Sequence, residues 1–138
     1  MTLPGPLVLS PNQAPRLNSG RHLMDGETLN IISALVGSNA AALTAFAGGG
    51  RAGAFQIVTA YAQFSTVASG NDSCVLPKSV PGMSIVIQND GANSMQVFAN
   101  GSDTINGTAG ATGVALASGA TAMYQCVVAG QWKRFVSA

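Results

Sequence analysis

Residues 72 to 138, DSCVLPKSVPGMSIVIQNDGANSMQVFANGSDTINGTAGATGVALASGATAMYQCVVAGQWKRFVSA, decide the fold class of this chain. Short apolar runs alternate there with clusters of Asn, Gly, Asp and Ser. Runs bounded by turn residues at such close spacing are typical of antiparallel β-sheets. A β scaffold with few charged side chains is suited to pack against another surface. We therefore expect a structural or adhesive role rather than catalysis.

Side-chain alternation and turn residues divide this region into strands. We predict strands near residues 55–67, 73–76, 83–88, 95–99, 113–117, 121–128 and 131–137. Met83, Ile85 and Ile87 share one face of their strand, and Ser84 and Gln88 share the other. The joints Asn89-Asp90-Gly91, Asn100-Gly101 and Asn106-Gly107 tolerate positive φ, and Gly130 suits a tight final hairpin. The expected class is mainly β, an antiparallel β-sandwich or jelly-roll-like module.

Residues 1–24 are predicted to form an extended N-terminal arm. Its prolines lack the donor that a helix interior or a central strand needs. Its apolar side chains could contact a partner or could fold back on the chain's own domain; they are Leu3, Leu7, Val8 and Leu9.

Residues 25–53 are predicted to be a short helical segment followed by a glycine-rich hinge. Asp25 can cap a helix over 25–36, in which Leu29, Ile32 and Leu35 recur at helical spacing. The β-branched pair at 31–32 leaves a strand open as the alternative. Residues 40–47 could add a further helical turn or two, and AGGGRAG at 47–53 leads into the β module, residues 54–138.

The composition argues against a freely soluble monomer. Charged residues make up 8% of the chain, against about 25% in ordinary soluble domains. The formal net charge is +1, so nucleic-acid binding is not expected. No apolar stretch approaches the roughly 18 residues of a membrane span, and no leader is evident, so we expect the chain to stay in the compartment that makes it. Cys74 and Cys126 are expected to be free, buried thiols.

The candidate chemical motifs lack the context that their chemistry needs. Gly48, Gly50 and Gly53 spell G-x-G-x-x-G, but a dinucleotide site requires a strand before and a helix after that motif. His22 is the only histidine, so no His-based zinc cluster exists. The aspartates of the β region, Asp72, Asp90 and Asp103, are ordinary turn residues. We expect no catalytic, metal or cofactor site and no enzymatic activity.

Trp132 is the one candidate for an adhesive aromatic. It falls in a predicted strand, so packing in the core is the first interpretation. Tryptophan is rarely fully buried, however, and an exposed ring could stack on a sugar.

The order of motifs resembles a β module of virion structural proteins in tailed bacteriophages. The pattern is an LP strand, then G-x-x-V-x-V-x-N-x-G-A-N-x-x-x-V-F, then G-D-T-I-N-G, and finally an aromatic strand with AG-x-W. It covers about half of the chain. The matching positions are Leu76-Pro77, Gly82, Asn89, Gly91-Ala92-Asn93, Asp103 to Gly107, Tyr124 and Gly130 to Trp132.

That resemblance implies a non-enzymatic virion component. The leading hypothesis is a capsid decoration (cement) protein on the exterior of a phage head, made in the host bacterial cytoplasm. Its expected partners are the major capsid protein and further copies of itself, as a homotrimer. Candidate interface residues are Leu3, Leu7, Val8, Leu9, Leu29, Ile32 and Leu35. The alternative is a tail-fibre or head-fibre module that binds a host receptor or carbohydrate.

Overall fold

The structure is a computed structural model that describes residues 39 to 137. The predicted arm, the predicted helix at 25–36 and His22 lie outside the described residues. So do all seven candidate interface residues, namely Leu3, Leu7, Val8, Leu9, Leu29, Ile32 and Leu35.

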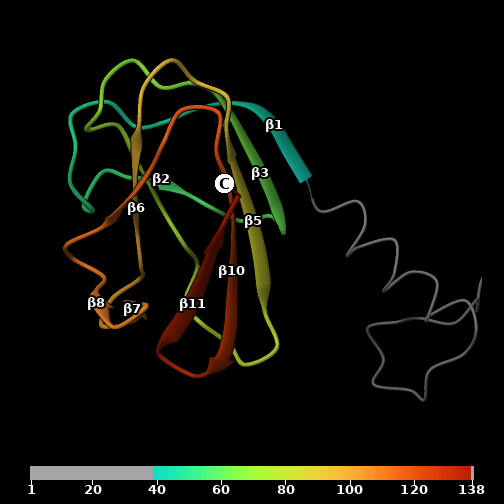
Figure 1. Cartoon of the computed structure of the whole chain (residues 1–138). Helices are drawn as coiled ribbons and strands as arrows, with labels where there is room; N and C mark the ends of the chain where they lie inside the picture. Colours follow the sequence, from blue (N-terminus) through green and yellow to red (C-terminus); the bar gives the residue numbers. More distant parts are fainter. Residues whose placement is uncertain (1–38, 138) are drawn as a thin grey trace, which may run out of the picture. The chain divides into compact units, whose positions relative to one another are not determined.

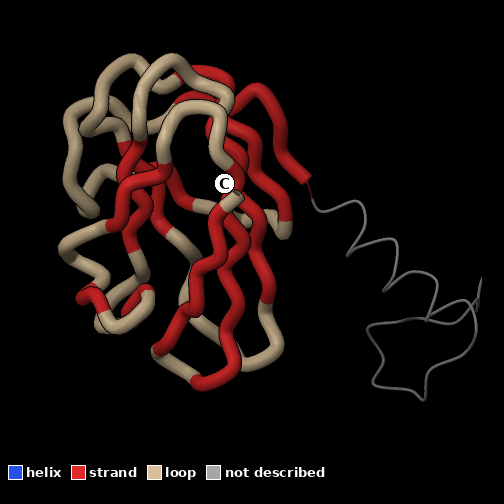
Figure 2. Tube along the Cα trace, viewed as in Figure 1, coloured by secondary structure: helices blue, strands red, loops and turns tan. Residues whose placement is uncertain are grey.

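The described part is mainly β, as predicted, and within it there is no helix (Figure 2). Its strands are β1 Asn39–Thr44, β2 Phe55–Gln56, β3 Tyr61–Thr66, β4 Ser73–Val75, β5 Ser84–Asn89, β6 Met95–Phe98, β7 Thr104–Ile105, β8 Thr108–Ala109, β9 Val114–Leu116, β10 Thr121–Val128 and β11 Gln131–Val136. The strands form a seven-stranded sheet, β1-β3-β5-β10-β11-β7-β8, and a four-stranded sheet, β2-β4-β6-β9. Figure 1 shows β1, β3, β5 and β10 side by side.

The first six strands alternate between the two sheets and pair in parallel. Strands β1, β3 and β5 are parallel neighbours in the larger sheet, and β2, β4 and β6 are parallel neighbours in the smaller one. Successive turns of the chain are therefore stacked, as the coils of a solenoid are. Parallel neighbours need a long crossover, and here each crossover passes through the other sheet.

The expected antiparallel pairing is therefore wrong for this first half of the β region. Antiparallel pairing holds for β10 with β5 and β11, for β6 with β9, and for the β7–β8 hairpin. Turn residues mark where a strand ends, but they do not say which way its neighbour runs.

Residues 39 to 53 belong to the β unit, which corrects the boundary expected at residue 54. The described residues, 39 to 137, fall in one compact unit. Residues 39 to 44, predicted in part as helix, form strand β1 and pair with β3. The glycine-rich segment connects β1 to β2, so the G-x-G-x-x-G motif lies between two strands and opens no helix.

The two sheets contribute to one core. In the larger sheet, Ala62, Ile87 and Ala122 are in register on adjacent strands and are buried. In the smaller sheet, Val97 and Leu116 belong to the same buried cluster. The rings of Phe55 in β2 and Phe64 in β3 meet edge to face, with centroids 5.4 Å apart, which joins the sheets directly.

Candidate functional site

Trp132 lies in the core and not on the surface. Its side chain is fully buried on the inner face of β11, paired with Cys126 of β10. The first interpretation, packing in the core, is therefore confirmed, and the alternative of an exposed, adhesive Trp132 is wrong. The alternation of β11 explains this: Trp132 points inward, while its neighbours Gln131 and Lys133 are exposed.

The carboxylates of the described region stabilise loops. Asp72 accepts hydrogen bonds from the Ser69 hydroxyl and from the amides of Ala68 and Ser69. These bonds, the hydroxyl first, hold the pKa of the Asp72 carboxyl below its ordinary value. Asp103 accepts a 2.7 Å bond from the amide of Ser79. The Asp72 carboxylate is occupied by its own loop, which fits the turn-residue interpretation, whereas Asp103 binds the loop before β5 and so links two loops.

Asp90 is held by side-chain amides. It accepts hydrogen bonds from Gln63 and Gln88, which lower the pKa of its carboxyl. Within residues 39 to 137, no group of three or more His, Cys, Asp or Glu side chains could hold a metal ion.

The two cysteines are free and buried, as predicted. Burial raises the pKa of the Cys74 thiol far above its ordinary value, because the core disfavours the thiolate. A thiol kept in its neutral form is a poor nucleophile. Cys74 is therefore a packing residue.

Asn89 is a buried polar hub that the sequence pattern shows only as a turn residue. It ends β5 and has no exposed surface. Its Nδ2 donates to the carbonyl oxygens of Asn93, Leu116 and Ala117 at 2.9 to 3.1 Å, and its Oδ1 accepts from the amide of Gly91. One side chain thus joins the loop after β5 to the loop after β9.

Neighbouring motif residues extend this network. Asn93 donates to the carbonyl oxygens of Val67 and Ala68. Gly91 does not have the positive φ expected of it; a Cβ there would come within 2.6 Å of Val67, so a side chain is excluded by close approach. At the β7–β8 turn, Asn106 and Gly107 do have positive φ, at 49° and 84°, as predicted.

The outer face of the larger sheet has an apolar row across four strands. Register places Tyr61 of β3 beside Val86 of β5, Val86 beside Met123 of β10, and Met123 beside Phe135 of β11. Tyr61 and Phe135 are each 54% exposed and Met123 is 37% exposed. We call these four residues the outer-face row.

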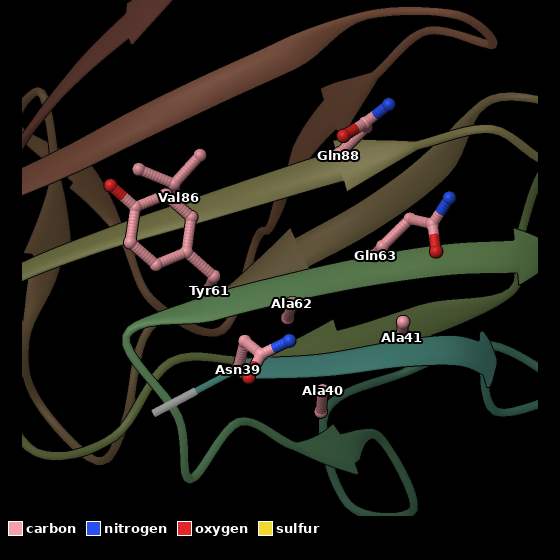
Figure 3. A pocket seen from close by; sticks show the side chains of 8 residues that line it. All are labelled: Asn39, Ala40, Ala41, Tyr61, Ala62, Gln63, Val86 and Gln88. Atoms are coloured by element: carbon pink, nitrogen blue, oxygen red, sulfur yellow. The ribbon is translucent and has the colours of Figure 1, made fainter. Parts of the chain in front are cut away.

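Neutral polar side chains border the outer-face row on both sides. Gln63 and Gln88 are paired on one side, and Ser84 and Gln125 on the other. Figure 3 shows the ring of Tyr61 close to Val86, with the amides of Gln63 and Gln88 further along the strands. A shallow hollow of about 100 Å³ lies here, with Asn39 of β1 also in its lining.

A second apolar surface lies at the β10–β11 hairpin. Val127 and Val128 are 73% and 55% exposed at the end of β10. Exposed Val80 lies in the loop before β5, which is tied to the hairpin because the amide of Gly130 donates to Ser79 Oγ and the amide of Gly82 donates to the carbonyl of Cys126. We call Val80, Val127 and Val128 the hairpin tip.

Sequence reasoning did not identify either surface. The signal for the outer-face row was present, because Tyr61, Val86, Met123 and Phe135 are apolar residues at strand positions whose neighbours point into the core. Only the register between strands brings them together.

No helix in the described part of the chain has the length and apolar character to cross a membrane. Comparison with protein-family models, with curated proteins and with solved structures gave no match. The function therefore has to be inferred from the residues of this chain.

Proposed function

We propose that this chain is a capsid decoration (cement) protein of a tailed bacteriophage. In this proposal it binds the outer surface of the assembled head and bridges neighbouring subunits of the major capsid protein. It is made in the host cytoplasm, acts on the exterior of the virion as a homotrimer, and has no enzymatic activity and no cofactor.

The observation that supports this proposal is the surface of the β unit. Large apolar side chains are exposed in the outer-face row and at the hairpin tip, while residues 39 to 137 contain only seven charged side chains. Two of those seven, Asp72 and Asp103, are buried and bind loop amides. Apolar, uncharged surface is the character of the buried centre of protein interfaces.

The motifs shared with the phage module have structural roles in this chain. Asn89, Gly91 and Asn93 join loops, Asn106-Gly107 makes a hairpin, and Trp132 fills the core. We therefore expect chains with this pattern to share the scaffold and to differ in the residues that face outward. We further propose a sandwich-like packing of the two sheets, which the shared core and the contact between Phe55 and Phe64 support.

The proposed mechanism is stabilisation by mass action. A protein that binds only the assembled shell raises the stability of that shell by RT ln(1 + [L]/Kd), which is about 2.7 kcal/mol at a free concentration of 100 Kd. The apolar residues of the N-terminal arm, residues 1–24, remain our candidates for the anchor. Within the described residues, the hairpin tip is a second candidate for the contact with the capsid.

Binding to heads tests this proposal. Purified heads of the phage that encodes the chain, stripped of decoration, are mixed with the full chain and sedimented. We expect saturable co-sedimentation and a higher temperature of head disruption. Deletion of residues 1 to 20 should abolish binding and leave the circular dichroism of the β unit unchanged. A full chain that does not sediment with these heads would overturn the proposal.

The alternative, a receptor-binding fibre module, draws support from a different observation. Tyr61 is an exposed aromatic ring that lines the hollow of Figure 3 together with Asn39, Gln63 and Gln88. An exposed aromatic ring and polar side chains that line one hollow are features of sugar-binding surfaces. Glycan-array binding that is lost in Tyr61→Ala and kept in Val80→Ala would favour this function over the cement function.

A further inference from the structure

We infer that the outer-face row is the contact through which copies of this chain associate with one another. This inference names the interface of the homo-oligomer in the proposed function, and it rests on that function only for the expectation of three copies. The row itself is a property of the described β unit.

The row has the geometry of an interface centre. Its four side chains are in register on adjacent strands, so they form one continuous band and not scattered exposed residues. Strands spaced about 4.8 Å apart, six to eight residues long at about 3.3 Å per residue, give a face of roughly 20 by 20 to 25 Å. With β1 beside it, that face has a projected area of roughly 500 to 600 Å², about two thirds of the roughly 800 Å² of accessible surface that each partner covers in a standard interface, so the polar border would also take part in the contact.

The polar border makes this face compatible with a copy of itself. Residues Gln63, Gln88, Ser84 and Gln125 are neutral, so two such faces can approach without repulsion between like charges. Lys133, paired with Gln125, is the one charged side chain that β3, β5, β10 and β11 direct to this face, and it lies beside the row and not in it. A partner with a strong charge, such as a nucleic acid, would find little to bind here.

The neighbouring carboxylate does not interrupt the face. Asp90 follows β5, and its two oxygens accept hydrogen bonds from Gln63 and Gln88. These bonds keep the two glutamines at the border of the row and offset the desolvation of the carboxylate.

Two arrangements place the row at the centre of an oligomer. In a two-fold pair the faces pack directly, as two sheets do at about 10 Å separation. In a three-fold assembly the rows of three copies face a common axis. In both, Val86 and Met123 at the middle of the row approach the same residues of another copy, and the solution mass distinguishes the two arrangements.

The test is the mass of the full chain in solution without any capsid, measured by light scattering over a range of concentrations. We expect two or three times the chain mass of 13.8 kDa. Met123→Asp places a carboxylate in the middle of the row and should raise the dissociation constant more than about tenfold, because an unpaired charge is costly to bury. Val80→Asp, at an exposed valine of the hairpin tip, is the matched control and should keep the native mass.

A cross-linking variant tests the same contact without weakening it. Met123→Cys should give a disulfide-linked pair under mild oxidation, whereas Val80→Cys should not, and the native Cys74 and Cys126 are buried. A native chain that stays monomeric, or a folded Met123→Asp chain with the native mass, would overturn the inference. The mass measurement uses no phage heads, so it tests this interface independently of head binding. A chain that is monomeric in solution but binds heads in the sedimentation experiment would overturn only this interface and leave the proposed function standing.

Discussion

At the scale of single residues, Asn89 is the position on which the loops depend most. Its Nδ2 is the donor for three carbonyl oxygens, and one of them, that of Leu116, lies in a fully buried contact. Asn89→Ala leaves these carbonyls and the Gly91 amide without their partner. Since each lost buried hydrogen bond costs about 1 kcal/mol, we expect a loss of about 2 to 4 kcal/mol in the free energy of unfolding.

Thermal and urea unfolding would measure that loss, with two variants for comparison. Asn93→Ala removes two bonds from a half-buried residue and should cost about 1 kcal/mol. Asn89→Asp keeps the shape but turns an acceptor toward three carbonyl oxygens, so it should be at least as damaging as Asn89→Ala. An equal loss in the free energy of unfolding for Asn89→Ala and Asn93→Ala would show that the hydrogen bonds of Asn89 contribute no more to stability than those of Asn93.

Sequence alone could predict the inward residues but not this hub. Alternation correctly placed Ile85 and Ile87 in the core, because a half-buried strand repeats every two residues. Asn89 follows them as the first residue of a turn motif, and asparagine is common in turns for local reasons. Its partners in the 116–117 loop are distant in sequence, so nothing local distinguishes it from Asn100.

At the scale of elements, β1 is an edge strand with a local irregularity. Ala42 has a φ of 56°, and the register with β3 shifts between Ala40 and Leu43. A left-handed conformation costs a residue with a Cβ about 1 to 2 kcal/mol, and glycine avoids that cost. A bulge of this kind also protects an exposed sheet edge from pairing with another chain.

Glycine substitutions along β1 test this strain. Ala42→Gly should leave the free energy of unfolding unchanged or raise it by up to about 1 kcal/mol, because relief of strain offsets the added freedom of the unfolded chain. Ala40→Gly, at a regularly paired position of the same strand, should cost about 0.5 to 1 kcal/mol. Chemical denaturation of both variants measures the difference, and an Ala42→Gly loss equal to that of Ala40→Gly would argue against a strained Ala42.

The same strand shows why some elements escape prediction from sequence. The segment NAAALT is rich in alanine, which favours helices over strands, and its strand form depends on pairing with β3. The direction of pairing was missed for a related reason. Alternation in β3 and β5 reports which side chains face inward, and it is the same for parallel and antiparallel neighbours.

At the scale of the whole molecule, the described unit should lose stability in acid through two carboxylates. Asp72 and Asp90 have pKa values lowered in the fold, chiefly by the Ser69 hydroxyl and by the Gln63 amide respectively. A lowered pKa means that each contributes stability above the pKa of the unfolded chain, and that this contribution disappears as the pH falls through the folded value. We expect a melting temperature with little dependence on these two groups between pH 7 and 5, and a decline that begins near the ordinary carboxyl pKa of 3.8 and continues below it.

The variant Asp72→Asn separates the two groups. An asparagine at 72 can still accept from the amides of Ala68 and Ser69 and can donate to the Ser69 hydroxyl, but it lacks the charge that strengthens these bonds, so the variant should be less stable at pH 7. Its stability should also change less between pH 5 and pH 3, because Asp90 is then the remaining one of the two carboxylates whose pKa is lowered in the fold. Calorimetry across this range, with Gln63→Ala as the variant that weakens the Asp90 contribution instead, measures both slopes. An Asp72→Asn chain with the full native acid dependence would mean that the loop after β3 is not where the acid sensitivity of the molecule resides.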